Sequence, residues 1–223
     1  MIVDLNMKNK DVLIIGAGIE GTKKVKLLAN YDCNIIIISE QFSQEIINYK
    51  KKYNLKLINK KIENISILDA FNSISMIFAT TDDKYLNQEI IKWAKDNKIL
   101  SYSTDNPPIS DFAFMSIINI ENLVEIGIST GGKSPLMNII LKKKLEKEIK
   151  NIIGADDITN IKIQEFARTH AKNYIEKPKD RKDFLYSLIN NSEIQELINK
   201  NNIDKVKERI INILEKLEDN RGR

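Results

Sequence analysis

The chain is poor in the residues that build disulfides and metal sites, with one cysteine and one histidine among its 223 residues. Cys33 cannot form an internal disulfide, and beside an apolar stretch we expect it to be a buried small residue rather than a reactive thiol. Without a Cys/His cluster, we predict no metal site. Apolar runs such as 35–38 are too short to span a bilayer. The first residues lack the apolar segment of a secretory signal, so we expect a cytoplasmic protein.

A strong net charge is also lacking. The chain has 35 Lys and Arg against 31 Asp and Glu, which leaves a formal charge of +4. This balance is too mild to indicate a nucleic-acid partner, but it is compatible with an anionic small molecule. Hydrophobic residues at 42% and charged residues at 30% are typical of a globular protein that neither spans a membrane nor stays disordered.

The first 110 residues alternate short β-rich runs with helical patterns, which indicates an α/β fold with a parallel sheet. Near-continuous apolar runs predict strands covered on both faces, at 12–15, 34–38, 55–58, 76–79 and 99–103. Helices are expected at 22–29 and 85–97. We therefore predict a Rossmann domain over residues 1–112.

The pattern changes after Pro107 and Pro108. Two strands at 113–118 and 123–128, joined by a polar turn, predict a β-hairpin. A helix should then begin at Pro135 with Ser134 as its N-cap. These elements form a small module over 113–150, and the helical periodicity beyond it predicts a helical domain over 151–223.

A Gly-x-Gly-x-x-Gly motif, GAGIEG at 16–21, lies between the first predicted strand and a helix. Glycines in this context let the backbone turn tightly and approach a pyrophosphate, which the free N–H groups of the helix start can bind. Glu40 lies 19 residues past Gly21, close to the spacing of a ribose-binding carboxylate, and no arginine stands beside it. The motif therefore predicts NAD rather than NADP; the alternative is a Rossmann-like fold without a nucleotide.

Polar residues follow the fourth and fifth predicted strands, at the sheet edge where open α/β folds bind ligands. Asp105 would face the nicotinamide there, as a general base for a dehydrogenation. Its alternative role is turn formation, since Asp-Asn-Pro-Pro is a strong turn sequence, and spacing alone does not separate the two. Asp82 and Asp83 read more simply as loop and cap residues of the next helix.

Four stretches together resemble the precorrin-2 dehydrogenase family, the type found at the N-terminus of siroheme synthases. They are IVDLNMKNKDVLIIGAGIEGTKKVKLL at 2–28, FATTDDKYLN at 78–87, STDNPPISDFAFMSII at 103–118 and GISTGGKSPLMNIILKKKLE at 127–146. They occur in the family's order and cover about the first 150 residues. The resemblance of the C-terminal helical part is weak.

The resemblance implies an enzyme that oxidises precorrin-2, an anionic tetrapyrrole, to sirohydrochlorin with NAD; some relatives also insert ferrous iron. It implies a homodimer built on the hairpin module, and a helical domain that completes the tetrapyrrole cleft. Where the family often has three consecutive glycines and an alanine, this chain has Gly16-Ala17-Gly18 and Gly21. Both differences are compatible with a dinucleotide. From the length of 223 residues we expect no fused methyltransferase domain.

Site residues follow from positions within the matching stretches. Asp105 corresponds to the family's catalytic aspartate. The expected cofactor contacts are Gly16, Ala17, Gly18, Ile19, Glu20, Gly21, Ser39, Glu40, Gln41, Thr80, Thr81 and Asp82. The expected substrate contacts are Asn87, Ser129, Gly131, Gly132 and Lys133. On this interpretation the second glycine-rich loop holds the carboxylates of the substrate rather than a nucleotide.

Three alternatives stay open at this point. Asp105 could also strip pyrrole protons during iron insertion, so a ferrochelatase activity is unresolved. A non-enzymatic NAD-responsive regulatory module would explain GAGIEG and Glu40, but not Asp105 together with the second loop. An NAD dehydrogenase for another small anion is the third. His170 shares a helical face with Ile163 and Phe166, where a lone histidine is more often packed than functional.

Overall fold

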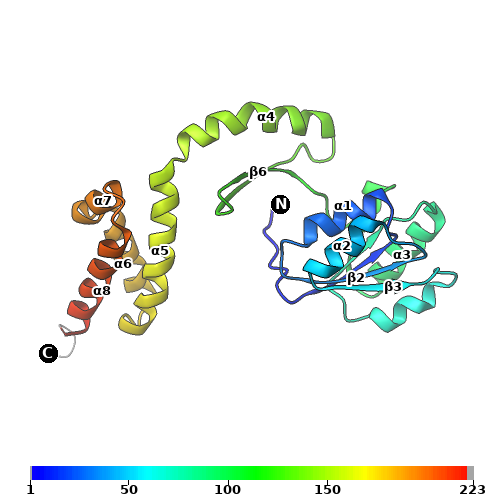
Figure 1. Cartoon of the computed structure of the whole chain (residues 1–223), viewed down its shortest axis with the longest axis horizontal. Coiled ribbons are helices and arrows are strands. Elements are labelled where there is room, and N and C mark those ends of the chain that lie inside the picture. The colour runs from blue at the N-terminus through cyan, green and yellow to red at the C-terminus, as the bar shows by residue number, and fades with distance from the viewer. Residues whose placement is uncertain (1, 220–223) are drawn as a thin grey trace. The chain divides into compact units, whose positions relative to one another are not determined.

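The computed structural model describes residues 2–219 and divides into two compact units. The first unit ends at Phe114 and the second begins at Met115. Figure 1 shows an α/β unit at the N-terminal end of the chain and a mainly helical one at the C-terminal end. Each unit has hydrophobic clusters of its own.

Five parallel strands form the sheet of the first unit, in the order β3-β2-β1-β4-β5. The strands are β1 (Asp11–Ile15), β2 (Asn34–Ser39), β3 (Leu55–Asn59), β4 (Met76–Ala79) and β5 (Leu100–Ser103). Strand order reverses between β1 and β4, which is the switch point where open α/β sheets bind ligands. The predicted Rossmann sheet is confirmed, and the first and last residues of each strand lie within one residue of their expected positions.

Helices cover both faces of this sheet, which explains the uninterrupted apolar runs of the strands. On one face, α1 (Ile19–Leu28) and α2 (Gln44–Lys52) bury Val25 and Ile46. On the other, the 3-10 helix η1 (Ile65–Phe71) and α3 (Lys84–Asp96) bury Leu68 and Ile90. A second 3-10 helix, η2 (Pro107–Ile109), follows β5. Sequence patterns had predicted α1 and α3, but neither α2 nor η1.

Cys33 lies in the cluster on the α1 side of the sheet, with 6% of its surface exposed. Its Sγ donates a weak hydrogen bond to the carbonyl oxygen of Leu28, 3.4 Å away. Burial raises the pKa of the thiol, which disfavours the reactive thiolate. The expectation of a buried small residue is confirmed.

The segment 110–114, called here the aromatic strap, packs against β4 and β5 on the α1 side. The Phe112 ring lies 5.8 Å from that of Phe78, and the Phe114 ring lies 5.3 Å from that of Tyr102. Asp111 anchors the strap, because its Oδ2 accepts hydrogen bonds from the backbone N–H and the hydroxyl of Ser101. Aromatic side chains of one short segment thus complete the core of the first unit.

Lys24, on α1, is almost buried beside the strap. Its Nζ lies 4.5 Å from the Tyr102 ring centroid and 4.6 Å from that of Phe114. Burial lowers the pKa of Lys24, and the nearby Glu20 carboxylate opposes that shift.

We expect Lys24→Met to keep or raise the melting temperature, because methionine preserves the packing and removes a desolvated charge. Lys24→Ala should instead cost about 1 kcal/mol, because the rings lose their cover. Thermal unfolding of both variants checks this. Equal losses in both would show that the ammonium–ring attraction outweighs its desolvation.

A two-stranded antiparallel hairpin opens the second unit, with β6 (Ser116–Ile120) and β7 (Val124–Ile128). Its turn contains Glu121 and Asn122, both at positive φ. The predicted hairpin is confirmed, but the strand expected at 113–118 starts too early. Residues 113–115 lie outside it, because Phe112 and Phe114 pack on the first unit and the positive-φ turn sets the register two residues later.

Helices complete the second unit: α4 (Pro135–Ile152), α5 (Ala155–Tyr174), α6 (Pro178–Ile189), α7 (Ser192–Asn199) and α8 (Ile203–Asp219). The last four share one core, in which the α8 residues Val206, Ile210 and Leu214 are fully buried. The hairpin packs through Ile118 on Ile158 of α5. Among residues 2–219, none of the helices has the length and apolar character needed to cross a membrane.

Candidate functional site

The GAGIEG motif forms the turn from β1 into α1. Gly16 has φ +98°, and a Cβ on it would lie 2.7 Å from the carbonyl oxygen of Thr80. Its own carbonyl oxygen accepts a hydrogen bond from Thr80 Oγ1, which also bonds the carbonyl oxygen of Ile15. Gly21 packs even more closely, since a Cβ there would clash with the Gly16 carbonyl oxygen. Only glycine fits at position 16. The turn is held by Thr80, a buried residue that directly follows β4.

Gly18 is different, because its surroundings are open. It is the N-cap of α1 with extended backbone angles, it provides no capping side chain, and a Cβ on it would meet no atom within 4 Å. The first N–H groups of α1 therefore have no capping side chain and lie at the positive end of the helix dipole. This backbone cradle fits the pyrophosphate of a dinucleotide. Beside it, Ala17 is buried, Ile19 is 78% exposed, and Glu20 pairs with Lys23.

The residues expected at the ribose follow β2. Ser39 ends the strand, Glu40 and Gln41 are exposed, and the Glu40 carbonyl accepts a hydrogen bond from Asn59. Sequence analysis missed Lys61, whose Nζ lies 3.9 Å from Glu40 Oε1. The sequence could have indicated this contact, because Lys60-Lys61 follows β3, and β3 is the parallel neighbour of β2 and ends at the same sheet edge. The position expected for the ribose thus has both a carboxylate and a cation beside it.

Asp105 lies just beyond the end of β5. The residue is exposed to solvent, but its carboxylate is hydrogen-bonded to buried side chains. Its Oδ1 accepts two hydrogen bonds of 2.8 Å, one from Ser103 Oγ and one from Asn87 Nδ2. Asn87 also bonds Thr81, whose neighbour Thr80 contacts the glycine turn. The structure thus brings together residues predicted separately after β1, β4 and β5. Asn87 itself has no exposed surface, so its predicted direct contact with substrate stays a prediction that its burial disfavours.

Asp82 and Asp83 differ in their surroundings. Asp83 is the N-cap of α3, and its Oδ1 accepts hydrogen bonds from the backbone N–H groups of Tyr85 and Leu86. Its expected role as a cap is confirmed. Asp82 is exposed in the loop before it, and its predicted cofactor contact stays a prediction.

The second glycine-rich loop belongs to the second unit, whereas the other predicted site residues belong to the first. Gly131 and Gly132 both have positive φ, and neither would meet an atom within 4 Å through a Cβ. Ser129 Oγ accepts a hydrogen bond from the Gly131 N–H, and Lys133 is exposed. Ser134 caps α4 through the Met137 N–H, as predicted. The loop is an open turn at a helix start, a geometry suited to an anion.

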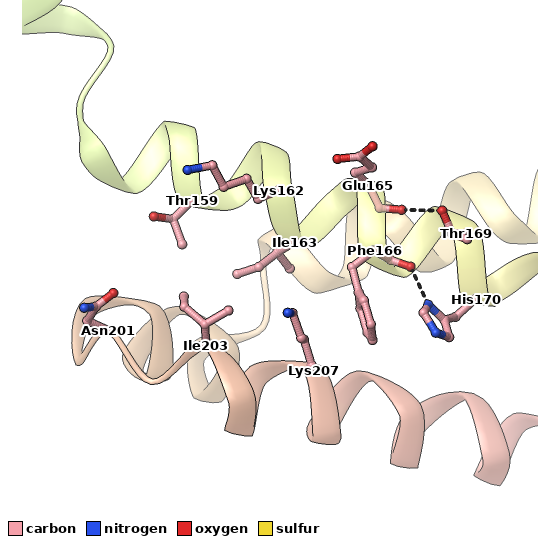
Figure 2. A pocket seen from close by; sticks show the side chains of 10 residues that line it. All are labelled: Thr159, Lys162, Ile163, Glu165, Phe166, Thr169, His170, Asn201, Ile203 and Lys207. Atoms are coloured by element: carbon pink, nitrogen blue, oxygen red, sulfur yellow. Dashed lines mark hydrogen bonds between the residues drawn. The ribbon is translucent and has the colours of Figure 1, made fainter. Parts of the chain in front are cut away.

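His170 lies in a groove of about 520 Å³ between α5 and α8 (Figure 2). Its Nδ1 bonds the carbonyl oxygen of Phe166, which can only accept, so Nδ1 carries the hydrogen. The His170 and Phe166 rings lie 4.0 Å apart, and Lys207 Nζ lies 5.6 Å from the Phe166 ring. These contacts are those of a packed and hydrogen-bonded histidine. No group of three His, Cys, Asp or Glu within the described chain could hold a metal ion.

Comparison with known families identifies the first unit. A family described as putative NAD(P)-binding matches residues 3–116, just over half of the chain. The chain belongs to this family. The match spans the whole parallel sheet, the glycine turn and Asp105, so the cradle at Gly18 lies within a recognised dinucleotide-binding domain.

Curated relatives extend the similarity to the second unit. The chain is 28% identical over 214 residues to a siroheme synthase of Buchnera aphidicola, covering 95% of this chain and 42% of that protein. It is 30% identical over 213 residues to a siroheme synthase of Blochmanniella floridana, covering 93% and 44%. The siroheme biosynthesis protein met8 of Schizosaccharomyces pombe is 28% identical over 158 residues, covering 69% and 58%. The chain thus spans less than half the length of the siroheme synthases.

One solved structure matches almost end to end. SirC, a precorrin-2 dehydrogenase, superposes with a TM-score of 0.67 over 97% of this chain and 99% of its own, at 18% sequence identity. At that identity the likeness establishes the fold. The predicted architecture, a Rossmann sheet followed by a small hairpin and a helical part, is confirmed by it.

Proposed function

We propose that this chain oxidises precorrin-2 to sirohydrochlorin with NAD as the cofactor. The observation that carries the proposal is the Asp105 carboxylate, exposed beyond β5 and joined by hydrogen bonds through Asn87 and Thr81 to the loop after β4 that braces the glycine turn. A proton acceptor next to a dinucleotide cradle suits a dehydrogenation. The siroheme synthase relatives and the SirC fold support precorrin-2 as the substrate.

The reaction removes a hydride and a proton from a reduced position of the macrocycle. Bound NAD supplies the hydride acceptor. Asp105 takes the proton on its carboxylate. The second glycine-rich loop, with Ser129 and Lys133, binds carboxylates of the substrate, and Glu40 binds the adenosine ribose. Its predicted place of action is the cytoplasm.

An anaerobic assay with purified protein, freshly generated precorrin-2 and NAD tests this function. Absorbance should report sirohydrochlorin and NADH appearing in equal amounts. A folded protein that binds NAD without turnover would overturn the proposal and favour a regulatory NAD-binding module. Adding ferrous iron to the completed reaction then tests for a chelatase activity, which would appear as siroheme.

Glu40 should determine the preference for NAD. A carboxylate at the ribose repels the 2′-phosphate of NADP, while Lys61 beside it would attract that group. We expect Glu40→Gln to weaken NAD binding about tenfold and to strengthen NADP binding. Fluorescence titration of both nucleotides measures the ratio of the two dissociation constants.

Glu45→Gln is the matched control for this prediction. Glu45 is also an exposed carboxylate in an ion pair, at 2.6 Å, but it lies on α2 and its partner is Lys26 of α1 rather than a lysine after β3. Its replacement should leave the ratio unchanged. An unchanged ratio in Glu40→Gln as well would remove Glu40 from the ribose site.

We further propose that the chain forms a homodimer through the module at 113–150. Its helix α4 has no buried residue, although several of its side chains are large and apolar. Leu136 is 66% exposed, Ile139 50% and Leu145 42%. Apolar surface on that scale along one helix is typical of an interface, and a second copy of this chain is the occupant that the resemblance implies.

Leu136→Asp and Ile139→Asp should therefore convert a dimer into a monomer. Each removes about 1.5–3 kcal/mol of apolar burial, twice per dimer if both chains use the same surface. Analytical ultracentrifugation at micromolar concentration measures the change. Tyr186→Asp, at a 58% exposed position on α6, is the control that should remain dimeric. A monomeric wild-type protein would contradict the proposal.

A further inference from the structure

Asn87 occupies the interior of the first unit, with no exposed surface, and every polar atom of its side chain is engaged. Its Oδ1 accepts hydrogen bonds from the backbone N–H of Thr81, at 3.2 Å, and from the Thr81 hydroxyl, at 2.7 Å. Its Nδ2 donates to the Thr81 carbonyl, at 2.9 Å, and to Asp105 Oδ1, at 2.8 Å. A buried amide with this many partners is held in one orientation.

The orientation of that amide is fixed by chemistry. The backbone N–H of Thr81 can only donate, so the atom of Asn87 that faces it must be the oxygen. The amide nitrogen is then the atom that faces Asp105. Asn87 therefore presents a donor to the carboxylate from a fixed position in the interior.

Ser103 provides a second buried donor to the same oxygen. It is the last residue of β5, has no exposed surface, and its hydroxyl donates to Asp105 Oδ1 at 2.8 Å. Its backbone N–H donates to Ser110 Oγ, so the end of the strand is held as well. No hydrogen bond from the described residues reaches the other carboxylate oxygen of Asp105, Oδ2.

We propose that Ser103 and Asn87 are positioning residues that hold Asp105 by Oδ1, which makes Oδ2 the atom that accepts the proton from the substrate. This inference rests on the proposed dehydrogenation. Two donors on one oxygen keep the carboxylate from rotating and leave the other oxygen without a hydrogen bond from the described residues. The carbon–hydrogen bond of the substrate breaks, its hydride leaves to the cofactor, and the proton forms a bond with Oδ2.

The two donors should have different effects when removed. Ser103 contacts Asp105 through its hydroxyl alone, so its loss should disturb only the carboxylate. Asn87 also holds Thr81, next to the Thr80 that braces the glycine turn, so its loss should disturb the cofactor site as well. We therefore predict that loss of the Ser103 hydroxyl lowers kcat alone, whereas loss of the Asn87 amide lowers kcat and also weakens nucleotide binding.

Ser103→Ala is the primary test, because it removes a hydroxyl and little volume. We expect kcat for precorrin-2 oxidation to fall at least about tenfold, since a misplaced catalytic group costs up to about 100-fold. The dissociation constant for NAD should stay within about twofold. Asn87→Asp keeps an oxygen for Thr81 but loses the donor to Asp105, and it should lower kcat further and weaken NAD binding.

Ser101→Ala is the matched control. Ser101 is also a fully buried serine of β5 whose hydroxyl donates to an aspartate, Asp111, at 2.7 Å. Its loss should reduce stability and leave kcat within about twofold. Ser103→Thr, which restores a hydroxyl, should recover part of the activity lost in Ser103→Ala.

Equal losses of kcat in Ser103→Ala and Ser101→Ala would reduce Ser103 to a structural role and overturn the inference. A kcat for Ser103→Ala that matches the wild type would do the same. Inactivity of folded wild-type protein would instead overturn the proposed function, and the positioning role with it. Wild-type turnover therefore separates the two failures.

Discussion

Replacing Asp105 by asparagine is expected to abolish precorrin-2 oxidation while NAD binding persists. Asparagine has the same shape, and its oxygen can still accept the hydrogen bonds from Ser103 and Asn87. Its amide nitrogen cannot take a proton, so the rate should fall by about 10²- to 10⁴-fold. Single-turnover absorbance of sirohydrochlorin measures the step itself.

Asp111→Asn is the control for this change. Asp111 is the other aspartate near β5 that accepts a hydrogen bond from a buried serine, and it holds the aromatic strap. Its replacement should affect the melting temperature more than kcat. Turnover by Asp105→Asn within a few-fold of the wild type would assign the proton to solvent and leave Asp105 an orienting role.

Gly16→Ala and Gly18→Ala, two changes in the same turn, should have different effects: the first should lower stability, and the second should weaken cofactor binding. An alanine at 16 would have to adopt φ +98° and would meet the Thr80 carbonyl at 2.7 Å, so we expect a loss of about 2–4 kcal/mol in stability. An alanine at 18 meets no protein atom and has permitted backbone angles, so stability should change by less than about 0.5 kcal/mol.

In folded protein, the effects of the two variants on NAD affinity should be in the opposite order: Gly18→Ala should weaken NAD binding more than Gly16→Ala. The Cβ at position 18 would project into the space where the pyrophosphate approaches the backbone, so NAD affinity should fall at least about tenfold. Thermal unfolding and isothermal titration calorimetry measure the two quantities. Undiminished NAD affinity in Gly18→Ala would mean that the dinucleotide does not cross the α1 N-terminus.

Patterns along the chain predicted the α/β unit closely, because each strand is an apolar run covered on both faces. They missed α2, whose only buried residue is Ile46 and whose last turn is three lysines, so its apolar stripe is too narrow to mark a helix. They began the first hairpin strand too early, at residue 113, whereas Phe112 and Phe114 pack on the first unit. Their packing on β4 and β5 is tertiary, and no local pattern reports it.

The candidate site shows the same division. The glycine turn and Asp105 could be found from sequence, since a motif and a resemblance marked them. Asn87 was assigned to the substrate, whereas the structure buries it beneath Asp105. Lys61 was missed because it follows a different strand from Glu40. Both contacts, Asn87 with Asp105 and Lys61 with Glu40, join segments about 20 residues apart, which spacing along one element cannot predict.

The aromatic strap bears on how such a domain can be separated and reused. Since Phe112 and Phe114 complete the core from the last residues of the first unit, a gene fragment that ends after Phe114 encodes all of its own apolar cover. A fragment that ends a few codons earlier leaves the Phe78 and Tyr102 rings facing water. Recombination at this seam could join the nucleotide-binding half to a different partner without redesign of its interior.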